Sequence, residues 1–237
     1  FDSWCCAWAA YHTNGLELLK WLKEQSCPWD EWTKAYAANS GNFEILEWAY
    51  DNGCPLGNSA PAYAAKNGHY DILLWLIDKG CPISSLTASY VSRNGELQIL
   101  KYIYSKFPNI LLDKFLFEYT AQDGQLEVLK WLHKNGCMGD SNSINMAIDS
   151  GYINVAKWLI EQGYEVDPMA IVNAISINNL DFAKWLYDIV DKFDITTMET
   201  AVVNAVETGN MEIMDWLYKN NCILTSASYI EACRGNN

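Results

Sequence analysis

The chain has 237 residues, of which half are apolar, and 29 acidic against 16 basic side chains give it a formal charge of −13. With only 14 glycines and 6 prolines, and no run near the roughly 18 apolar residues of a membrane helix, the composition is that of a folded globular chain. The acidic balance excludes non-specific binding to nucleic acid or anionic lipid, because both depend on clustered Lys and Arg.

An aromatic residue recurs along the chain at nearly constant spacing. Trp21, Trp48, Trp75 and Tyr102 follow one another at intervals of 27 residues. Trp131, Trp158, Trp185 and Trp216 continue the series at intervals of 27 to 31. A fixed period of this length is the signature of a repeat architecture.

Two further markers keep the same phase. A cysteine lies six residues after the aromatic in five copies: Cys27, Cys54, Cys81, Cys137 and Cys222. A glycine, called here the anchor, lies seven residues before it: Gly41, Gly68, Gly95, Gly124, Gly151 and Gly209, with Asn14 and Asn178 in the other two copies. The sequence therefore predicts eight copies of one unit, and a ninth beginning near Tyr229.

Each copy is predicted to form two short helices. The first is rich in alanine and carries an aromatic residue, as in 33–41 and 60–68, so that neighbouring copies can approach closely. Helix starts are predicted at Asp167, which precedes a proline, and at Thr196, which has Glu199 in the spacing of a capping box.

The second helix has an apolar stripe at helical spacing. In 124–136 the stripe comprises Val128, Leu129, Trp131 and Leu132. The helix is expected to end at a left-handed glycine: Gly53, Gly80, Gly136 or Gly163. One such pair cannot bury its own stripe, so stacked pairs are expected to share a core to which the tryptophans contribute.

The predicted fold is therefore all-α, an α-solenoid of stacked helix-turn-helix repeats that forms a single array over residues 1–237. Because residue 1 is Phe rather than Met, we expect this array to be part of a longer chain. A leucine-rich repeat is the alternative, since its period covers 27 residues and Leu126, Leu129 and Trp131 imitate its pattern. That family lacks an alanine-rich helix before the run.

Several segments resemble the ankyrin repeat. GHYDILLWLIDKGCPIS (68–84) and GYINVAKWLIEQGYEVD (151–167) are similar to its second-helix pattern, and APAYAA (60–65) falls where the family has T-P-L-H-x-A. The linker CPWDEWT (27–33) resembles that of the Trp-rich ankyrin arrays of giant DNA viruses and some protists. The resemblance covers the whole chain and implies a protein-binding module.

The departures from this family concern the turns. The usual ankyrin unit has about 33 residues, so a unit of 27 implies shortened hairpin loops between the helix pairs. Tyr36 and Tyr63 replace the family's histidine, and only Thr33 and Thr87 supply its threonine. The Thr–His hydrogen bond of the family is therefore in doubt.

No catalytic, cofactor-binding or metal-binding residues are expected, and the chain is interpreted as non-enzymatic. Cysteines one repeat apart are too distant for disulfides and lack the paired spacing of zinc sites, so they are interpreted as buried, reduced thiols at the contacts between repeats. Reduced thiols indicate an intracellular, cytoplasmic protein, in the host cytoplasm if the protein is viral. His12, His69 and His133 lie in different phases of the repeat.

Positions that vary between repeats are the candidates for binding. Two polar residues precede each anchor glycine, and the resemblance implies that they line the concave surface together with the turns. The candidate protein-binding residues are Trp29, Glu31, Asn39, Ser40, Lys66, Asn67, Arg93, Asn94, Gln122, Asp123, Asp149 and Ser150. Insertions at 107–117 and 188–197 predict loops, with an exposed apolar patch near Ile110, Leu111 and Leu112.

The predicted function is a non-enzymatic scaffold that binds a partner protein on the concave or loop face, with no nucleic acid or membrane partner. We expect a monomer. The alternatives are a structural spacer that assembles end to end through Trp4, Cys5 and Trp8, and the substrate-recognition part of a ubiquitin-ligase adaptor. The adaptor role requires an F-box-like segment, which is not visible in these residues.

Overall fold

The computed structural model of the chain describes residues 1–112, 114–190, 194–220 and 222, and it leaves out the side chains of residues 111 and 112. Within those ranges it contains sixteen α-helices in eight pairs and no strand, which confirms the predicted all-α repeat. The chain divides into two compact units. The first comprises Phe1–Leu116 with Lys130–Cys137, and the second comprises Phe117–Leu129 and the residues from Met138 on.

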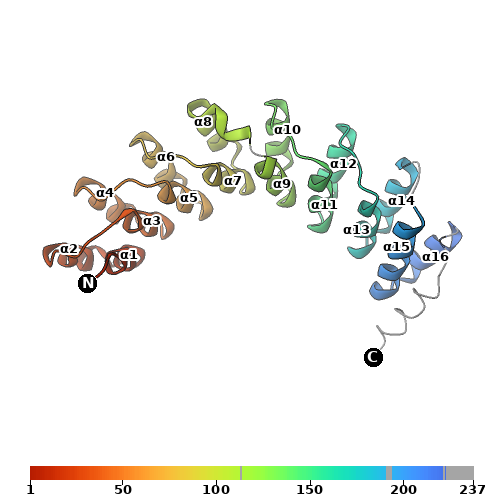
Figure 1. Cartoon of the computed structure of the whole chain (residues 1–237), viewed down its shortest axis with the longest axis horizontal. Helices are drawn as coiled ribbons and strands as arrows, with labels where there is room; N and C mark the ends of the chain where they lie inside the picture. Colours follow the sequence, from red (N-terminus) through yellow and green to blue (C-terminus); the bar gives the residue numbers. More distant parts are fainter. Residues whose placement is uncertain (113, 191–193, 221, 223–237) are drawn as a thin grey trace. The chain divides into compact units, whose positions relative to one another are not determined.

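The first unit has its helices in two rows (Figure 1). One row holds the first helix of each pair: α1 (Ser3–Tyr11), α3 (Glu31–Asn39), α5 (Ser59–Lys66) and α7 (Ser85–Arg93). The other row holds the second helices: α2 (Leu16–Glu24), α4 (Phe43–Asp51), α6 (Tyr70–Asp78) and α8 (Leu97–Lys106). A short 3₁₀ helix, η1 (Pro108–Leu112), follows α8.

The second unit repeats this arrangement. Its first helices are α11 (Ser141–Asp149), α13 (Met169–Ser176) and α15 (Ile195–Thr208), and its second helices are α12 (Ile153–Glu161), α14 (Leu180–Ile189) and α16 (Met211–Lys219). Helices α9 (Lys114–Gln122) and α10 (Leu126–Lys134) precede them in the sequence.

Alanine allows the first helices to approach one another. In α3 the side chains of Ala35, Ala37 and Ala38 are fully buried, and in α5 Ala64 and Ala65 are as well. The closest packing between repeats is that of α1 on α3 and of α3 on α5. A methyl group leaves the helix axes close together, whereas larger side chains would hold them apart.

The repeat aromatic is not the core residue that the sequence predicted. Trp21 is 47% exposed, and Trp48, Trp75 and Trp158 are only half-buried. The residue that follows the aromatic is buried in every copy: Leu22, Ala49, Leu76, Ile103, Leu132, Leu159, Leu186 and Leu217. Because the alanine-rich first helices leave a narrow interior, aliphatic side chains fill the core and the indoles lie at its flank.

The aromatics at the flank link successive second helices. Tyr50, two residues after Trp48, meets Trp75 of the next repeat edge to face, with ring centroids 5.3 Å apart. The same contact joins Tyr104 to Trp131 at 5.3 Å. Tyr187 and Trp216 repeat it in the second unit at 5.4 Å. Such pairs add about 0.5–1.5 kcal/mol each beyond the area that they bury.

The anchor glycines adopt the left-handed backbone conformation, which the sequence analysis had not assigned to them. Gly124 has φ 73° and Gly151 has φ 82°, and Asn178, which replaces a glycine, has φ 61°. The four predicted C-terminal glycines of the second helices are left-handed as well. Asparagine is the side chain that tolerates this region best.

Replacing Gly124 by Ala is expected to lower the free energy of unfolding by more than the same change at Gly151. Both variants force a methyl group into the left-handed region, at a cost of about 1–2 kcal/mol. At Gly124 the new Cβ would also overlap the Tyr152 ring, whereas at Gly151 nothing lies within 4 Å. Urea denaturation of the two variants compares them, and an equal loss at both sites would contradict the role of the Tyr152 contact.

Two sequence predictions about junctions need correction. Helix α15 begins at Ile195, and its N-cap is Asp194, whose Oδ1 accepts a hydrogen bond from the Thr197 backbone N–H; Thr196 is therefore not the cap. The helix has 14 residues, so part of the insertion at 188–197 lengthens a helix instead of forming a loop. Asp167 does cap α13, since its Oδ1 accepts from Met169 N at 2.9 Å.

The predicted apolar patch after α8 can be described only in part. Ile110 is half-buried within η1. The side chains of Leu111 and Leu112 lie outside the described residues, as does the ninth copy predicted near Tyr229.

Candidate functional site: an aromatic face on the first helices

Large aromatic side chains cover part of the first-helix row in the first unit. Trp4, Trp8 and Tyr11 of α1 are 50%, 53% and 40% exposed. Trp32, Tyr36 and Tyr63 from the next two first helices are half-buried beside them. These six residues are called the aromatic patch below. Isolated exposed apolar residues are ordinary, whereas a contiguous cluster is typical of a binding surface.

The rings of the patch contact one another across three repeats. Trp4 stacks on Trp32 with centroids 6.3 Å apart and planes 21° apart, and Trp32 meets Tyr63 at 6.4 Å. Tyr36 is 6.0 Å from both Trp8 and Tyr11. The patch is thus one continuous surface built from α1, α3 and α5.

A shallow cavity of about 290 Å³ opens within the patch. It is lined by Trp8, Tyr11, Tyr36, Asn39 and Tyr63. The Asn39 Oδ1 accepts a hydrogen bond of 2.9 Å from the amide of Asn67 in the next repeat, which orients the Asn39 side chain at the edge of the cavity. The lining therefore combines aromatic rings with one oriented amide and contains no charged group.

The helical period explains why these rings point outward. In α3, Ala35, Ala37 and Ala38 face neighbouring helices and are fully buried, so Tyr36 is left on the opposite side. A tyrosine occupies the same position, five residues before the anchor, in four consecutive copies: Tyr36, Tyr63, Tyr90 and Tyr119. This recurrence was the available signal for the patch.

Sequence reasoning found this site only in part, since it named Trp4 and Trp8 for end-to-end assembly and not for binding another protein. Of the predicted binding residues, Asn39 lines the cavity and Asn67 donates a hydrogen bond to Asn39. Tyr36 and Tyr63 were noted only as replacements of a family histidine. The missing criterion was that a first helix made of alanine has no interior space for a tyrosine, so a recurrent ring there must face outward.

Several of the predicted polar residues join repeats together. The Ser40 hydroxyl donates to the carbonyl oxygen of Tyr36 at 3.1 Å and lies 3.5 Å from that of Ala10 in the preceding repeat. The Asn94 amide donates to the carbonyl oxygen of Ala65 at 2.9 Å. Lys66 is exposed and Arg93 is half-buried at the ends of their helices. The polar residues that precede the anchor glycines therefore contribute to the stacking of repeats as well as to the surface.

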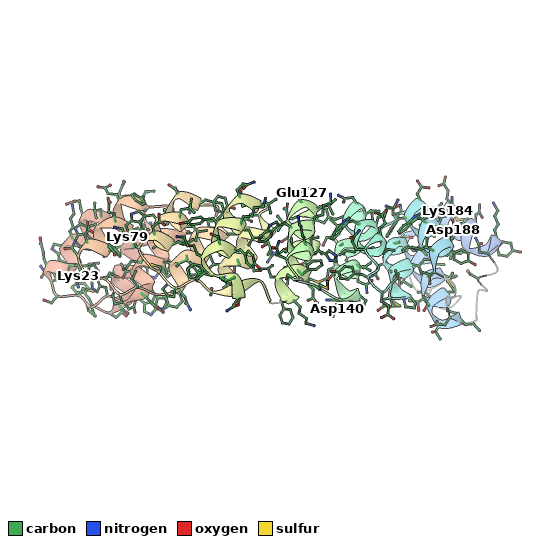
Figure 2. All side chains as sticks on the ribbon, turned by 90° about the horizontal axis from the view of Figure 1, so that it is seen from above. Lys23, Lys79, Glu127, Asp140, Lys184 and Asp188 are labelled. Carbon is green, nitrogen blue, oxygen red and sulfur yellow. The ribbon has the colours of Figure 1, made fainter. Side chains whose placement is uncertain are left out.

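Trp29 lies away from the patch, and Glu31 is the first residue of α3. Trp29 packs edge-on against Trp48 with centroids 5.8 Å apart, and the Lys23 ammonium lies 4.0 Å from the Trp29 ring centroid (Lys23 is labelled in Figure 2). Glu31 packs against Gly57, where an added Cβ would overlap its carboxylate. Trp29 thus belongs to the second-helix side of the unit.

The other four predicted residues belong to the second unit. Gln122 and Asp123 are half-buried, whereas Asp149 and Ser150 are exposed. Although the Asp149 side chain is exposed, partial desolvation of its carboxyl raises the pKa above its usual value. No role in binding follows from these positions by themselves.

The cysteines pack between repeats as predicted. Cys27, Cys54 and Cys81 are buried, and all seven cysteines in the described residues are free. The Cys54 thiol donates to the Asp30 carbonyl oxygen at 3.2 Å, and burial raises the pKa of Cys54 to about 11. A thiol with a raised pKa holds little of the reactive thiolate at neutral pH.

The lysine of α3 occupies a core position. Lys34 is 2% exposed, and its Nζ has no hydrogen-bond partner among the described residues. Its nearest aromatic is Tyr50, whose ring centroid is 5.0 Å away. Burial lowers the pKa of the Lys34 amine below 10.5. In the other seven copies this position is apolar and buried: Ala7, Pro61, Ala88, Phe117, Ile144, Ile171 and Val202.

The expected loss of the family's Thr–His hydrogen bond is visible beside this lysine. Thr33 is fully buried, and its hydroxyl also has no hydrogen-bond partner among the described residues. Tyr36, which stands in place of the histidine, points into the aromatic patch instead.

The fold and this face define the class: a helical repeat protein whose paired helices stack side by side. Comparison with known families finds a match of residues 6–87 to the model of ankyrin repeats in three copies. Ankyrin repeats therefore occupy this segment, which confirms the resemblance over residues 6–87. A search of curated proteins finds no match to the sequence. None of the helices in the described ranges combines the length and apolar character needed to cross a membrane.

Proposed function

We propose that this chain is a protein-binding scaffold and that the aromatic patch is the centre of its binding face. Ankyrin repeats are in general protein–protein interaction modules, and the matched segment contains five of the six residues of the patch. Trp and Tyr are the side chains most enriched where binding energy concentrates in protein interfaces.

The observation that carries this proposal is the exposure of the rings of α1. Trp4 and Trp8 are each about half exposed although they lie next to the fully buried Cys6, Ala7 and Ala9. Burial of an aromatic side chain contributes about 1.5–3 kcal/mol relative to its exposure. A partner that covers both indoles and the neighbouring tyrosines would therefore gain several kcal/mol at this surface.

The proposal includes an intracellular setting, supported by the seven free cysteines in the described part of the chain. It does not include catalysis, because ankyrin repeats are in general interaction modules and the lining of the cavity holds no carboxylate, imidazole, amine or thiol. The role of a ubiquitin-ligase adaptor is a narrower form of the same proposal.

Affinity capture from cell lysate with quantitative mass spectrometry tests this function. A double variant, Trp8→Ala with Tyr36→Ala, is expected to lose the specific partners of the wild-type chain. Trp21→Ala is the matched control, because this indole is 47% exposed but belongs to α2 in the other row. Equal partner sets for the double variant and the wild type would refute the proposed face.

Sedimentation velocity separates the proposed role from end-to-end assembly. A scaffold that binds other proteins is expected to sediment as a monomer at all concentrations tested. A sedimentation coefficient that increases with concentration, and that Trp8→Ala returns to the monomer value, would favour assembly through the same rings.

A further inference from the structure

We propose that the aromatic patch binds an extended peptide in the polyproline II conformation. The peptide would present an apolar residue, preferably proline, at every third position, with acidic residues at the end that lies toward α7. This inference rests on the proposed function and specifies the chemistry of the partner.

The first argument is the match of two periods. Tyr36, Tyr63 and Tyr90 occupy equivalent positions on α3, α5 and α7. Packed helices are about 8–10 Å apart, so successive tyrosines are separated by about that distance. A polyproline II helix has three residues per turn and rises about 3.1 Å per residue, or about 9 Å per turn. Every third residue of such a peptide would therefore meet one tyrosine.

The second argument is the chemistry of the lining. Flat aromatic rings bind proline side chains well, because a proline-rich segment is already ordered and loses little entropy on binding. A polyproline II backbone makes no internal hydrogen bonds, so its carbonyl groups need donors. The tyrosine hydroxyls and the indole N–H groups of Trp8 and Trp32 are such donors.

The third argument is the distribution of charge in the first unit. The exposed or half-buried charged side chains of its first helices are one acid, Glu31, and two bases, Lys66 and Arg93, which lie in the last turns of α5 and α7. The second helices of the unit carry the exposed acids: Glu17, Glu24, Glu44, Glu47, Asp51, Asp71 and Asp78. The first-helix row thus runs from an aromatic end at α1, a helix that has no charged residue between Ser3 and Tyr11, to a basic end at α7. A peptide with apolar residues followed by acidic ones complements this order.

A helical ligand fits the row less well. An α-helix rises only about 1.5 Å per residue and places side chains three and four residues apart on one face, so it cannot present one side chain to each repeat without long gaps. The cavity of about 290 Å³ is also shallow, and it accepts single side chains better than the edge of a helix.

Selection of random dodecapeptides displayed on phage against the whole chain tests the inference. The enriched sequences are expected to share prolines or apolar residues at i, i+3 and i+6 with Asp or Glu on one side only. A labelled peptide of the enriched sequence is then titrated by fluorescence anisotropy. We expect Tyr36→Ala to weaken its binding at least about tenfold, and Trp21→Ala to change it less than about twofold.

A charge exchange tests the orientation of the peptide. Lys66→Glu is expected to weaken the binding of the acidic peptide about three- to tenfold. The same variant is expected to bind more tightly a peptide in which Lys replaces each acidic residue. Circular dichroism of each variant checks that the helices remain intact.

The outcomes distinguish the two proposals. Enriched peptides with helical spacing, or with basic residues in place of acidic ones, would overturn this inference; if they still require Tyr36, the proposed binding face stands. Both proposals would be overturned if the enriched peptides bound Tyr36→Ala and Trp8→Ala as tightly as they bind the wild-type chain. A selection that enriches no peptide would also overturn both proposals.

Discussion

Replacement of Lys34 by Met should raise the free energy of unfolding by about 1–3 kcal/mol, which is the usual cost of a buried polar group without a partner. Lys34 is 2% exposed, and its Nζ lacks a hydrogen-bond partner among the described residues. Methionine has nearly the same length and no charge, so it can fill the same space. Equilibrium denaturation in urea at neutral pH measures the difference.

The gain should depend on pH. The folded state holds the Lys34 pKa below the 10.5 of a free lysine. Between these two values the unfolded chain binds more protons, so wild-type stability receives a contribution that rises with pH. Below the folded pKa the lysine is charged in both states and the full cost of burial remains. The advantage of Lys34→Met should therefore be largest toward neutral pH and shrink as the pH approaches 10.5.

Lys66→Met provides the control for this prediction. Lys66 is the exposed lysine of the next first helix, where the same change should alter stability by no more than about 0.5 kcal/mol. A destabilised Lys34→Met protein would mean that the ammonium group has a stabilising partner. A constant difference between pH 7 and pH 10 would mean that its pKa is not lowered.

Replacement of Leu22 by Ala should lower the free energy of unfolding by about 2–5 kcal/mol, the range for a leucine removed from a packed core. The same change at the adjacent Trp21 should cost about 1 kcal/mol or less, because that side chain is 47% exposed. Leu22 is only 3% exposed and lies at the position that is buried in all eight copies. Thermal and urea unfolding of the two variants gives the comparison.

The comparison of Leu22→Ala with Trp21→Ala shows which residue of the repeat forms the core. The larger side chain would be the more costly to remove if the indoles filled the interior, as the sequence pattern predicted. If Trp21→Ala lost as much free energy of unfolding as Leu22→Ala, or more, Trp21 would be a core residue of the first repeat.

The repeat itself was predictable from the sequence. The spacing of the aromatics, the anchor glycines and the cysteines reports backbone requirements that recur in each copy, and these act over a few residues. Gly53 and Gly80 were predicted to be left-handed and Cys54 to be a buried thiol, and both predictions are confirmed. The all-α class and the ankyrin resemblance followed from the same local patterns.

The allocation of side chains between the core and the surface was decided by tertiary packing. A stripe at helical spacing is wide enough to include both Trp21 and Leu22, and only the distance to the first-helix row determines which one is covered. The small alanine side chains let the first helices pack closely, so the interior has no room for the indole and Tyr36 faces outward.

The sequence by itself thus determined the period, the helices and the turns, because each depends on residues near one another in the chain. The tertiary structure alone decided that Lys34 is buried with no hydrogen-bond partner among the described residues, and that rings from three repeats form one patch. The patch depends on contacts between residues about one repeat length apart, and such contacts exist only after the repeats have stacked.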